Sequence, residues 1–147
     1  MTRIRHERLA HLVKAATRAF VRALQARLAR HGVPFGHWVF LRILWQGDGL
    51  TQRALSREAG VMEPTTTAAL VAMERSGYVV RRRLADNRRN VYVFLTPRGR
   101  ALERKLVPLA REVNRIAVRG VPRTDLAATR STLLAILANL SADEEPG

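Results

Sequence analysis

The chain has 147 residues, of which 47% are hydrophobic and only 5% are aromatic, so we expect one compact domain packed mainly through aliphatic side chains. Lys and Arg total 26 against 12 Asp and Glu, and the resulting formal charge of +14 is typical of proteins that bind a polyanion. The sequence contains no Cys, which excludes disulfides, thiol catalysis and thiolate zinc sites. No stretch has the length and apolarity of a membrane span, and no apolar signal core follows the basic N-terminus, so we expect a cytoplasmic protein without a membrane partner.

The positive charge is unevenly distributed along the chain. Residues 1–47 carry nine cations and one acid, residues 48–100 carry ten Arg and five acids, and residues 101–147 carry seven cations and six acids. The first two thirds should therefore contain the surface that meets the polyanion. Residues 141–147 are rich in acids and end in Pro-Gly, which predicts a flexible acidic tail.

The first predicted element is a long helix from Glu7 to Arg30, along which apolar residues recur at steps of three and four. Gly32 and Pro34 end it. A second helix from Phe35 to Trp45 is apolar almost all round, so it should be buried.

Two short helices separated by a tight turn are predicted next. The first covers residues 50–60, with Thr51 as its N-cap and Gly60 just beyond its end. Pro64 suits the first position of the second helix, which Gly77 closes. A β-hairpin should follow, because two segments of strand propensity flank a polar turn rich in Arg: the strands are residues 78–84 and 91–95, and the turn is residues 85–90.

A long helix capped by Thr96 and opened by Pro97 comes after the hairpin, and Pro108 should bend it. Its apolar residues repeat at steps of four, three, four and three, as in a coiled coil: Leu102, Leu106, Leu109, Val113 and Ile116. This stripe can be ordinary core within the chain, but its place on a terminal helix favours a homodimer seam. A last helix is marked by Leu126, Leu133, Leu137 and Leu140.

The predicted fold class is mainly α with a small β-wing, in which a helix-turn-helix precedes a two-stranded hairpin. In this arrangement one helix presents side chains to the major groove of DNA, and Arg on the hairpin can reach the narrower minor groove. The segments Leu50–Leu55, Gly60–Val79, Asp86–Arg88 and Leu95–Gly99, with their spacing, resemble the multiple antibiotic resistance regulator (MarR) family of bacterial winged-helix transcription factors.

The resemblance covers nearly the whole chain and implies a winged helix-turn-helix region at residues 35–96 and dimerisation helices at residues 1–34 and 97–140. It also implies DNA contacts by residues of the helix-turn-helix and the hairpin: Thr51, Gln52, Arg53, Pro64, Thr65, Thr67, Ala68, Arg81, Arg83, Asp86, Arg88 and Arg89. Position 68 is often Arg in the family, and Ala68 removes that guanine reader. Asp86 matches the acid that braces a minor-groove Arg, which we expect to be Arg88 or Arg89. The alternative is that Arg81–Arg83 form a solvated strand face and that Arg88 and Arg89 are only solvated.

The resemblance further implies a pocket for aromatic or phenolic anions between the dimerisation helices and the winged helix. Candidate ligand residues come from the first two helices: His11, Arg18, Phe20, Arg22, Phe35, Trp38, Arg42 and Trp45. The alternative is that the aromatic residues are core and the Arg residues are surface. The basic first helix, which includes Arg3, Arg5, Arg8 and Lys14, could also attract flanking DNA or a larger anion such as an acyl-coenzyme A thioester.

No residue pattern favours catalysis or metal binding. The four His lack metal-ligand spacing, and neither a Gly-rich phosphate loop nor a catalytic set stands out, so we expect no enzyme activity, no cofactor and no metal. The function expected is a homodimeric, sequence-specific regulator, a repressor more than an activator. A small aromatic or acyl-thioester anion would release it from a near-palindromic operator. The alternative is a low-specificity protein that coats DNA in the nucleoid, which the charge of +14 and Ala68 favour.

Overall fold

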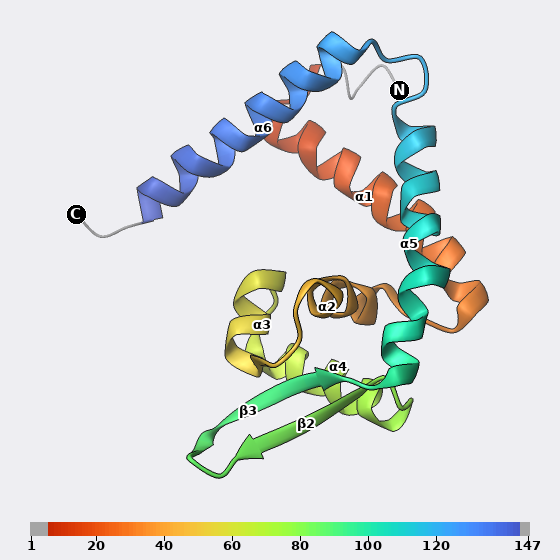
Figure 1. The fold of residues 1–147 in the computed structure, drawn as a ribbon. Helices are drawn as coiled ribbons and strands as arrows, with labels where there is room; N and C mark the ends of the chain where they lie inside the picture. The colour runs from red at the N-terminus through yellow and green to blue at the C-terminus, as the bar shows by residue number, and fades with distance from the viewer. Residues whose placement is uncertain (1–5, 145–147) are drawn as a thin grey trace. The chain divides into compact units, whose positions relative to one another are not determined.

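The computed structural model describes residues 6–144, whose helices and strands are shown in Figure 1. The chain divides into two compact units between Val113 and Asn114. This boundary lies inside a helix. In chain order the elements are α1 (Leu9–Leu28), η2 (Ala29–His31), α2 (Phe35–Gln46), β1 (Leu50–Thr51), α3 (Gln52–Ala59), α4 (Glu63–Arg75), β2 (Val79–Leu84), β3 (Asn87–Leu95), α5 (Pro97–Ala117) and α6 (Arg123–Glu144).

Helix α1 ends as the sequence predicts, because Gly32 adopts a φ of 69°, a left-handed conformation that suits glycine. Its apolar stripe is buried only at the C-terminal end, at Leu24 and Leu28. Leu9 and Phe20, on the same stripe, remain exposed in the single chain.

Helix α3 confirms both predicted caps. The side chain of Thr51 accepts a hydrogen bond from the backbone N–H of Ala54 at 3.0 Å, and Gly60 follows the helix with a φ of 67°. Helix α4 begins one residue earlier than predicted, so Pro64 is its second residue. This position tolerates proline because its N–H would have no partner within the helix.

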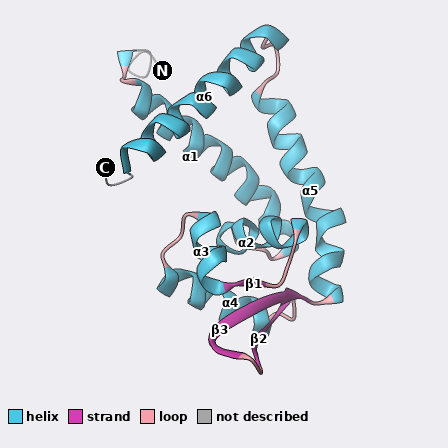
Figure 2. Ribbon diagram, turned by 60° about the vertical axis from the view of Figure 1, so that its left-hand side comes forward, coloured by secondary structure: helices cyan, strands magenta, loops and turns pink. Residues whose placement is uncertain are grey.

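The sheet has three antiparallel strands in the order β1-β3-β2, where the sequence predicted a two-stranded hairpin (Figure 2). Strand β1 pairs Leu50 with Val93 and Thr51 with Tyr92. A strand of two residues is too short to show an alternating pattern, which is why the sequence did not reveal it.

The hairpin of β2 and β3, here called the wing, is longer than predicted. Strand β3 starts at Asn87, which pairs with Leu84, so the turn contains only Ala85 and Asp86. Arg88 and Arg89 therefore lie on the strand and not in a broad polar turn. Cross-strand pairing outweighs the low strand propensity of these polar residues.

The core of the first unit is one apolar cluster that joins α2, α4, the sheet and α5. Leu102, Leu106 and Val113 belong to this cluster, and the side chain of Leu106 is fully buried. Most of the stripe expected to form a dimer seam is therefore core within the chain, and the alternative reading is correct for these three residues. Ile116, at the end of the stripe, is 43% exposed.

In the second unit, α6 runs from Arg123 to Glu144, so Ser141 to Glu144 are helical and do not belong to a tail. Residues 145–147 of the expected tail lie outside the described residues. Four leucines of α6 are exposed: Leu133, Leu134, Leu137 and Leu140. None of the helices between residues 6 and 144 combines the length and apolarity needed to span a membrane.

Candidate nucleic-acid interface

The N-terminal half of α4 presents polar and small side chains to solvent. Thr65, Thr67 and Ala68 are exposed, whereas Thr66 and Leu70 are fully buried. The buried hydroxyl of Thr66 donates to the carbonyl of Met62 at 3.2 Å, which satisfies it inside the core. The helix is thus oriented by its inner face, as the sequence predicted, and its outer face is available to a partner.

A chain of hydrogen bonds connects α4, the start of α3 and the wing. Nε2 of Gln52 donates to Oγ1 of Thr67 at 3.2 Å, and Oε1 of Gln52 accepts from Nη1 of Arg81 at 3.2 Å. Nη2 of Arg81 lies 3.4 Å from Oε1 of Glu74, and the backbone N–H of Arg81 donates to Oε2 of Glu74 at 3.1 Å. Three segments far apart in the sequence are therefore held by one polar network.

Arg81 has a different environment from the one expected of a DNA contact. Its side chain is only 25% exposed, it forms an ion pair with Glu74, and its Nε is buried without a hydrogen-bond partner among the described residues. The Arg81 guanidinium is thus engaged within the chain by Gln52 and Glu74, and its contact with DNA stays a prediction. This environment was not predictable from the sequence, because Gln52 and Glu74 lie on two separate elements, α3 and α4.

The distal half of the wing carries four exposed arginines: Arg82, Arg83, Arg88 and Arg89. Nη1 of Arg83 donates to the backbone carbonyl of Arg88 at 2.6 Å, and the guanidinium of Arg82 lies 5.9 Å from the ring centre of Phe94. Within residues 6–144 these arginines make no recorded ion pair, so their positive charge faces solvent. Arg82 was not among the predicted contacts, although its neighbours were.

The acid expected to brace a wing arginine does not do so in this structure. Asp86 is exposed in the turn, and it takes part in no ion pair recorded for the described part of the chain. Thr51, also predicted to contact DNA, uses its side-chain oxygen as the cap of α3, while Arg53 and Pro64 are exposed.

The base of the wing is fastened at both edges. The hydroxyl of Thr96 donates to the carbonyl of Gly77 at 2.6 Å and accepts from the N–H of Gly99 at 3.0 Å. Oδ2 of Asp48 accepts from the N–H of Leu95 at 2.8 Å and pairs with Arg100 at 3.1 Å. These contacts fix the direction in which the wing leaves the domain.

The residues predicted to bind a ligand are divided between the core and the surface. Trp38 is buried, its ring meets that of Trp45 edge to face at 5.6 Å, and Phe35 packs half-buried against the same core. These aromatics therefore contribute to the core, as the alternative reading expects, and their part in ligand binding stays a prediction. The other candidates are exposed: His11, Arg18, Phe20, Arg22 and Arg42. Arg3 and Arg5 lie outside the described residues.

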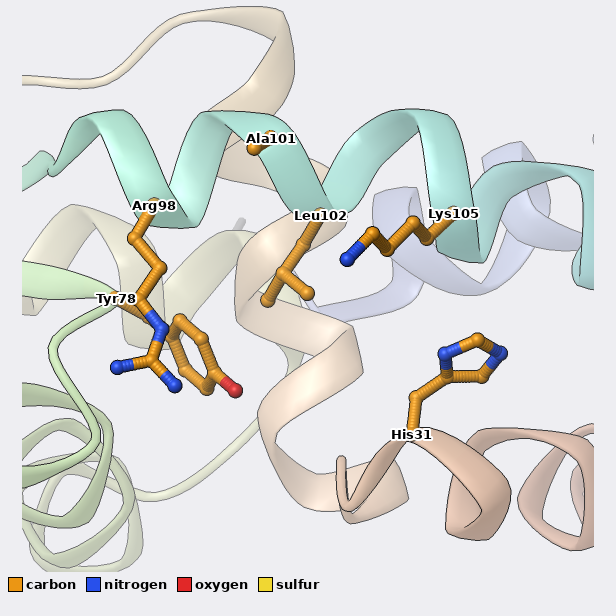
Figure 3. A pocket seen from close by; sticks show the side chains of 6 residues that line it. All are labelled: His31, Tyr78, Arg98, Ala101, Leu102 and Lys105. Atoms are coloured by element: carbon orange, nitrogen blue, oxygen red, sulfur yellow. The ribbon is translucent and has the colours of Figure 1, made fainter.

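The structure has a different pocket, of about 260 Å³, within the first unit (Figure 3). Its lining combines basic, aromatic and small apolar side chains: His31, Tyr78, Arg98, Ala101, Leu102 and Lys105. The guanidinium of Arg98 lies 5.3 Å from the ring centre of Tyr78, so it covers the face of that ring. The pocket therefore suits an anion that is recognised by charge more than by stacking.

Burial lowers the pKa of His37, in α2, below its ordinary value, because desolvation disfavours the charged ring. Among residues 6–144 no three side chains of His, Asp or Glu gather in an arrangement that could hold a metal ion.

A helix-turn-helix with a basic wing and flanking helices defines the class of winged-helix regulators, and comparisons with known proteins give the family. The MarR family model matches residues 36–91. The HTH-type transcriptional regulator TtmR of Methylorubrum extorquens (strain PA1) is 35% identical over 98 residues, which are 67% of this chain and 50% of that protein. The homoprotocatechuate degradative operon repressor of Escherichia coli is 29% identical over 97 residues, 66% of each chain.

A solved structure of a MarR transcriptional regulator from Methanosarcina mazei Go1 superposes with a TM-score of 0.82 and 26% identity, covering 91% of this chain and 97% of that chain. The present chain belongs to the MarR family. It spans half the length of TtmR.

Proposed function

We propose that the chain is a homodimeric, sequence-specific DNA-binding regulator that acts as a repressor. The observation that carries the proposal is the exposed polar half of α4 together with a wing whose four arginines are exposed. Figure 2 shows α4 and the wing in the same part of the fold. A helix fits the major groove of B-DNA, where base edges differ, and guanidinium groups suit phosphates and the narrow minor groove. The element order supports this assignment, since α4 would read bases while the wing fixes the register.

The repressor role is supported by the relatives. The Escherichia coli protein is named as the repressor of a degradative operon, and it aligns with two thirds of the present chain. A regulator of this size represses most simply by occupying a promoter. The two-fold symmetry of a dimer would require a near-palindromic operator with half-sites about 34 Å apart.

Homodimer formation is supported by large apolar side chains that are exposed to solvent within residues 6–144. On α1 they include Leu9 and Phe20, and on α6 they include Leu134 and Leu137, which is 65% exposed. Sedimentation of the full chain should give a dimer at micromolar concentration. Leu137→Gln should weaken it and exposed Thr132→Gln should not, whereas a wild-type monomer would refute a pre-formed dimer.

The competing function is low-specificity coating of DNA, which the charge of +14 and Ala68 favour. Non-specific binding depends almost wholly on counterion release, so its affinity falls steeply with salt and hardly depends on sequence. The two functions therefore differ in the ratio of affinities for operator and unrelated DNA.

The wing provides a direct test of the DNA-binding surface. Replacing Arg88 and Arg89 together by Gln should weaken DNA binding at about 150 mM salt. It should also reduce the slope of log affinity against log salt concentration by about two for each wing that contacts DNA. Arg111→Gln, an exposed arginine on α5, is the matched control and should change binding little. Equal effects of the wing and control substitutions would show that the wing does not contact DNA.

The regulator should also respond to a small anion that binds the pocket of Figure 3, where Arg98 and Lys105 project from α5. A cavity of about 260 Å³ is below the usual size of a drug-sized site, which favours a small aromatic anion over an acyl-coenzyme A thioester. We expect the dimer to exchange between two states that differ in the spacing of its two α4 helices, one of which fits DNA. The ligand would bind the other state more tightly, and the ratio of its affinities for the two states would set how much operator affinity is lost.

Benzoate, inorganic phosphate and acetyl-coenzyme A are suitable probes for this response. If the pocket is the effector site, Lys105→Gln weakens benzoate binding, and exposed Arg104→Gln on the same helix does not. If acetyl-coenzyme A alone binds, or if both variants bind benzoate as the wild type does, the effector assignment is wrong.

A further inference from the structure

The hydrogen bonds around Thr67 determine which kind of group its hydroxyl can still bind. A threonine hydroxyl has one proton to donate and two lone pairs that accept. Oγ1 of Thr67 donates that proton to the carbonyl of Glu63 at 3.0 Å, since a carbonyl oxygen can only accept. One lone pair is then occupied by the N–H of Gln52 at 3.2 Å. The hydroxyl retains one lone pair and no proton.

The orientation of the Gln52 amide is fixed by its other neighbour. A guanidinium has donors only, so the amide atom 3.2 Å from Nη1 of Arg81 must be the oxygen. The amide nitrogen therefore points to Thr67. Arg81 is in turn held by Glu74 through its backbone N–H at 3.1 Å and its guanidinium at 3.4 Å. The donor and acceptor of every hydrogen bond in this network are therefore determined, starting from the carboxylate of Glu74, which can only accept.

We infer that Thr67 is an acceptor-only reader of the major groove and that Gln52 is the residue that positions it. In the major groove the donors on base edges are the amino groups of adenine and cytosine, while thymine and guanine present oxygen acceptors at the corresponding positions. Thr67 should thus prefer adenine or cytosine on the strand it faces and should disfavour thymine or guanine there. Turning its proton toward a base acceptor would break the bond to Glu63.

The same geometry excludes Gln52 and Arg81 as independent base readers in this state. The Gln52 amide already uses its oxygen on Arg81 and one N–H on Thr67. The guanidinium of Arg81 is mostly covered and paired with Glu74. Their contribution to recognition is to hold the Thr67 hydroxyl in one hydrogen-bonding state.

This inference rests on the proposed DNA-binding function, and selection of binding sites from a random duplex pool by the full chain tests the two separately. The contact position is the one whose base preference Thr67→Val alone removes, because valine keeps the shape and lacks the acceptor. There the wild type should favour adenine or cytosine over thymine or guanine by about three- to tenfold, as expected for one hydrogen bond. Thr129→Val is the matched control, since the exposed hydroxyl of Thr129 donates to the carbonyl four residues earlier, as that of Thr67 does, but lies on α6, outside the proposed interface.

Gln52→Met distinguishes positioning from a general structural role. If Gln52 positions Thr67, the preference at that position shrinks while the preferences at other positions remain. If it only supports the fold, affinity falls for all sequences alike, and the positioning role is refuted. A wild type that prefers thymine or guanine at the Thr67 position, or a Thr67→Val variant with an unchanged preference, overturns the inference while leaving the proposed function intact. A wild type that selects no sequence refutes both.

The hydrogen bond can also be measured without DNA. The Nε2 protons of Gln52 should move upfield in the NMR spectrum of Thr67→Val and stay in place in Thr129→Val. No movement in Thr67→Val would overturn the inference at its first step.

Discussion

The indole nitrogen of Trp45 donates a hydrogen bond to the backbone carbonyl of Gly99, with 2.9 Å between the two atoms, across 54 residues of sequence. This bond joins α2 to the first turn of α5. Gly99 also lies against the backbone of Tyr78, since a Cβ at that position would collide with the carbonyl oxygen of Tyr78. The helix that precedes the helix-turn-helix, the base of the wing and the long helix after it therefore meet at one point.

Loss of the indole donor should destabilise this junction. Trp45→Phe keeps an aromatic ring but leaves the Gly99 carbonyl without that partner, so we expect the free energy of unfolding to fall by about 0.5–1.5 kcal/mol. Urea unfolding followed by circular dichroism measures the change. An unchanged stability would mean that water replaces the indole without cost.

The close approach of Gly99 to the Tyr78 backbone predicts a larger loss of stability than that of Trp45→Phe. In Gly99→Ala the new methyl group collides with backbone, which must shift, so we expect a loss of at least about 1–3 kcal/mol. Gly36→Ala is the matched control, because its Cβ meets nothing within 4 Å and the residue is helical. The control should gain about 0.5–1 kcal/mol, since alanine has the higher helix propensity. Similar effects of the two substitutions would refute the close packing at Gly99.

The stripe on α5 should separate into core and surface positions. Leu106→Ala should lower the free energy of unfolding by about 2–5 kcal/mol, because Leu106 is fully buried within the chain. Ile116→Ala, at an exposed position, should change the free energy of unfolding little. If a partner subunit covers Ile116, the change should be larger and should depend on protein concentration. A small, concentration-dependent effect of Leu106→Ala would instead restore the dimer-seam interpretation.

Stability should fall in mild acid through His37. Its pKa is lowered in the folded state, so the unfolded chain binds more protons between the folded value and the ordinary value of 6.5. The contribution of His37 is therefore complete above about pH 7 and is lost as the pH falls below 6.5. Thermal unfolding of His37→Gln should depend less on pH over this range than that of the wild type. Identical pH profiles for the two proteins would contradict the prediction.

Much of the fold could be predicted from signals that act over a few neighbouring residues. Thr51 and Gly60 define both ends of α3, and the spacing of Thr66, Leu70 and Met73 gives the inner face of α4, because capping and helical periodicity act over a few residues. The extent of the wing was not predictable from local propensity, since pairing of Leu84 with Asn87 is a cross-strand effect.

The candidate site was predicted less completely, because its contacts join distant segments. The exposed faces of Thr65 and Thr67 follow from the helix pattern, but the ion pair of Arg81 with Glu74 and the bond from Gln52 depend on how α3, α4 and β2 pack. Leu106 illustrates the same limit, since a regular heptad-like stripe does not reveal whether its partner is the same chain or another one.

The most direct test of the account is the ratio of affinities of the full chain for the DNA upstream of its own gene and for unrelated DNA of equal length, measured by gel shift at about 150 mM salt. A sequence-specific regulator should form a discrete complex that survives excess unrelated DNA, with a ratio of at least about 10³. A complex that any DNA displaces equally well would contradict specific recognition and support the coating function instead.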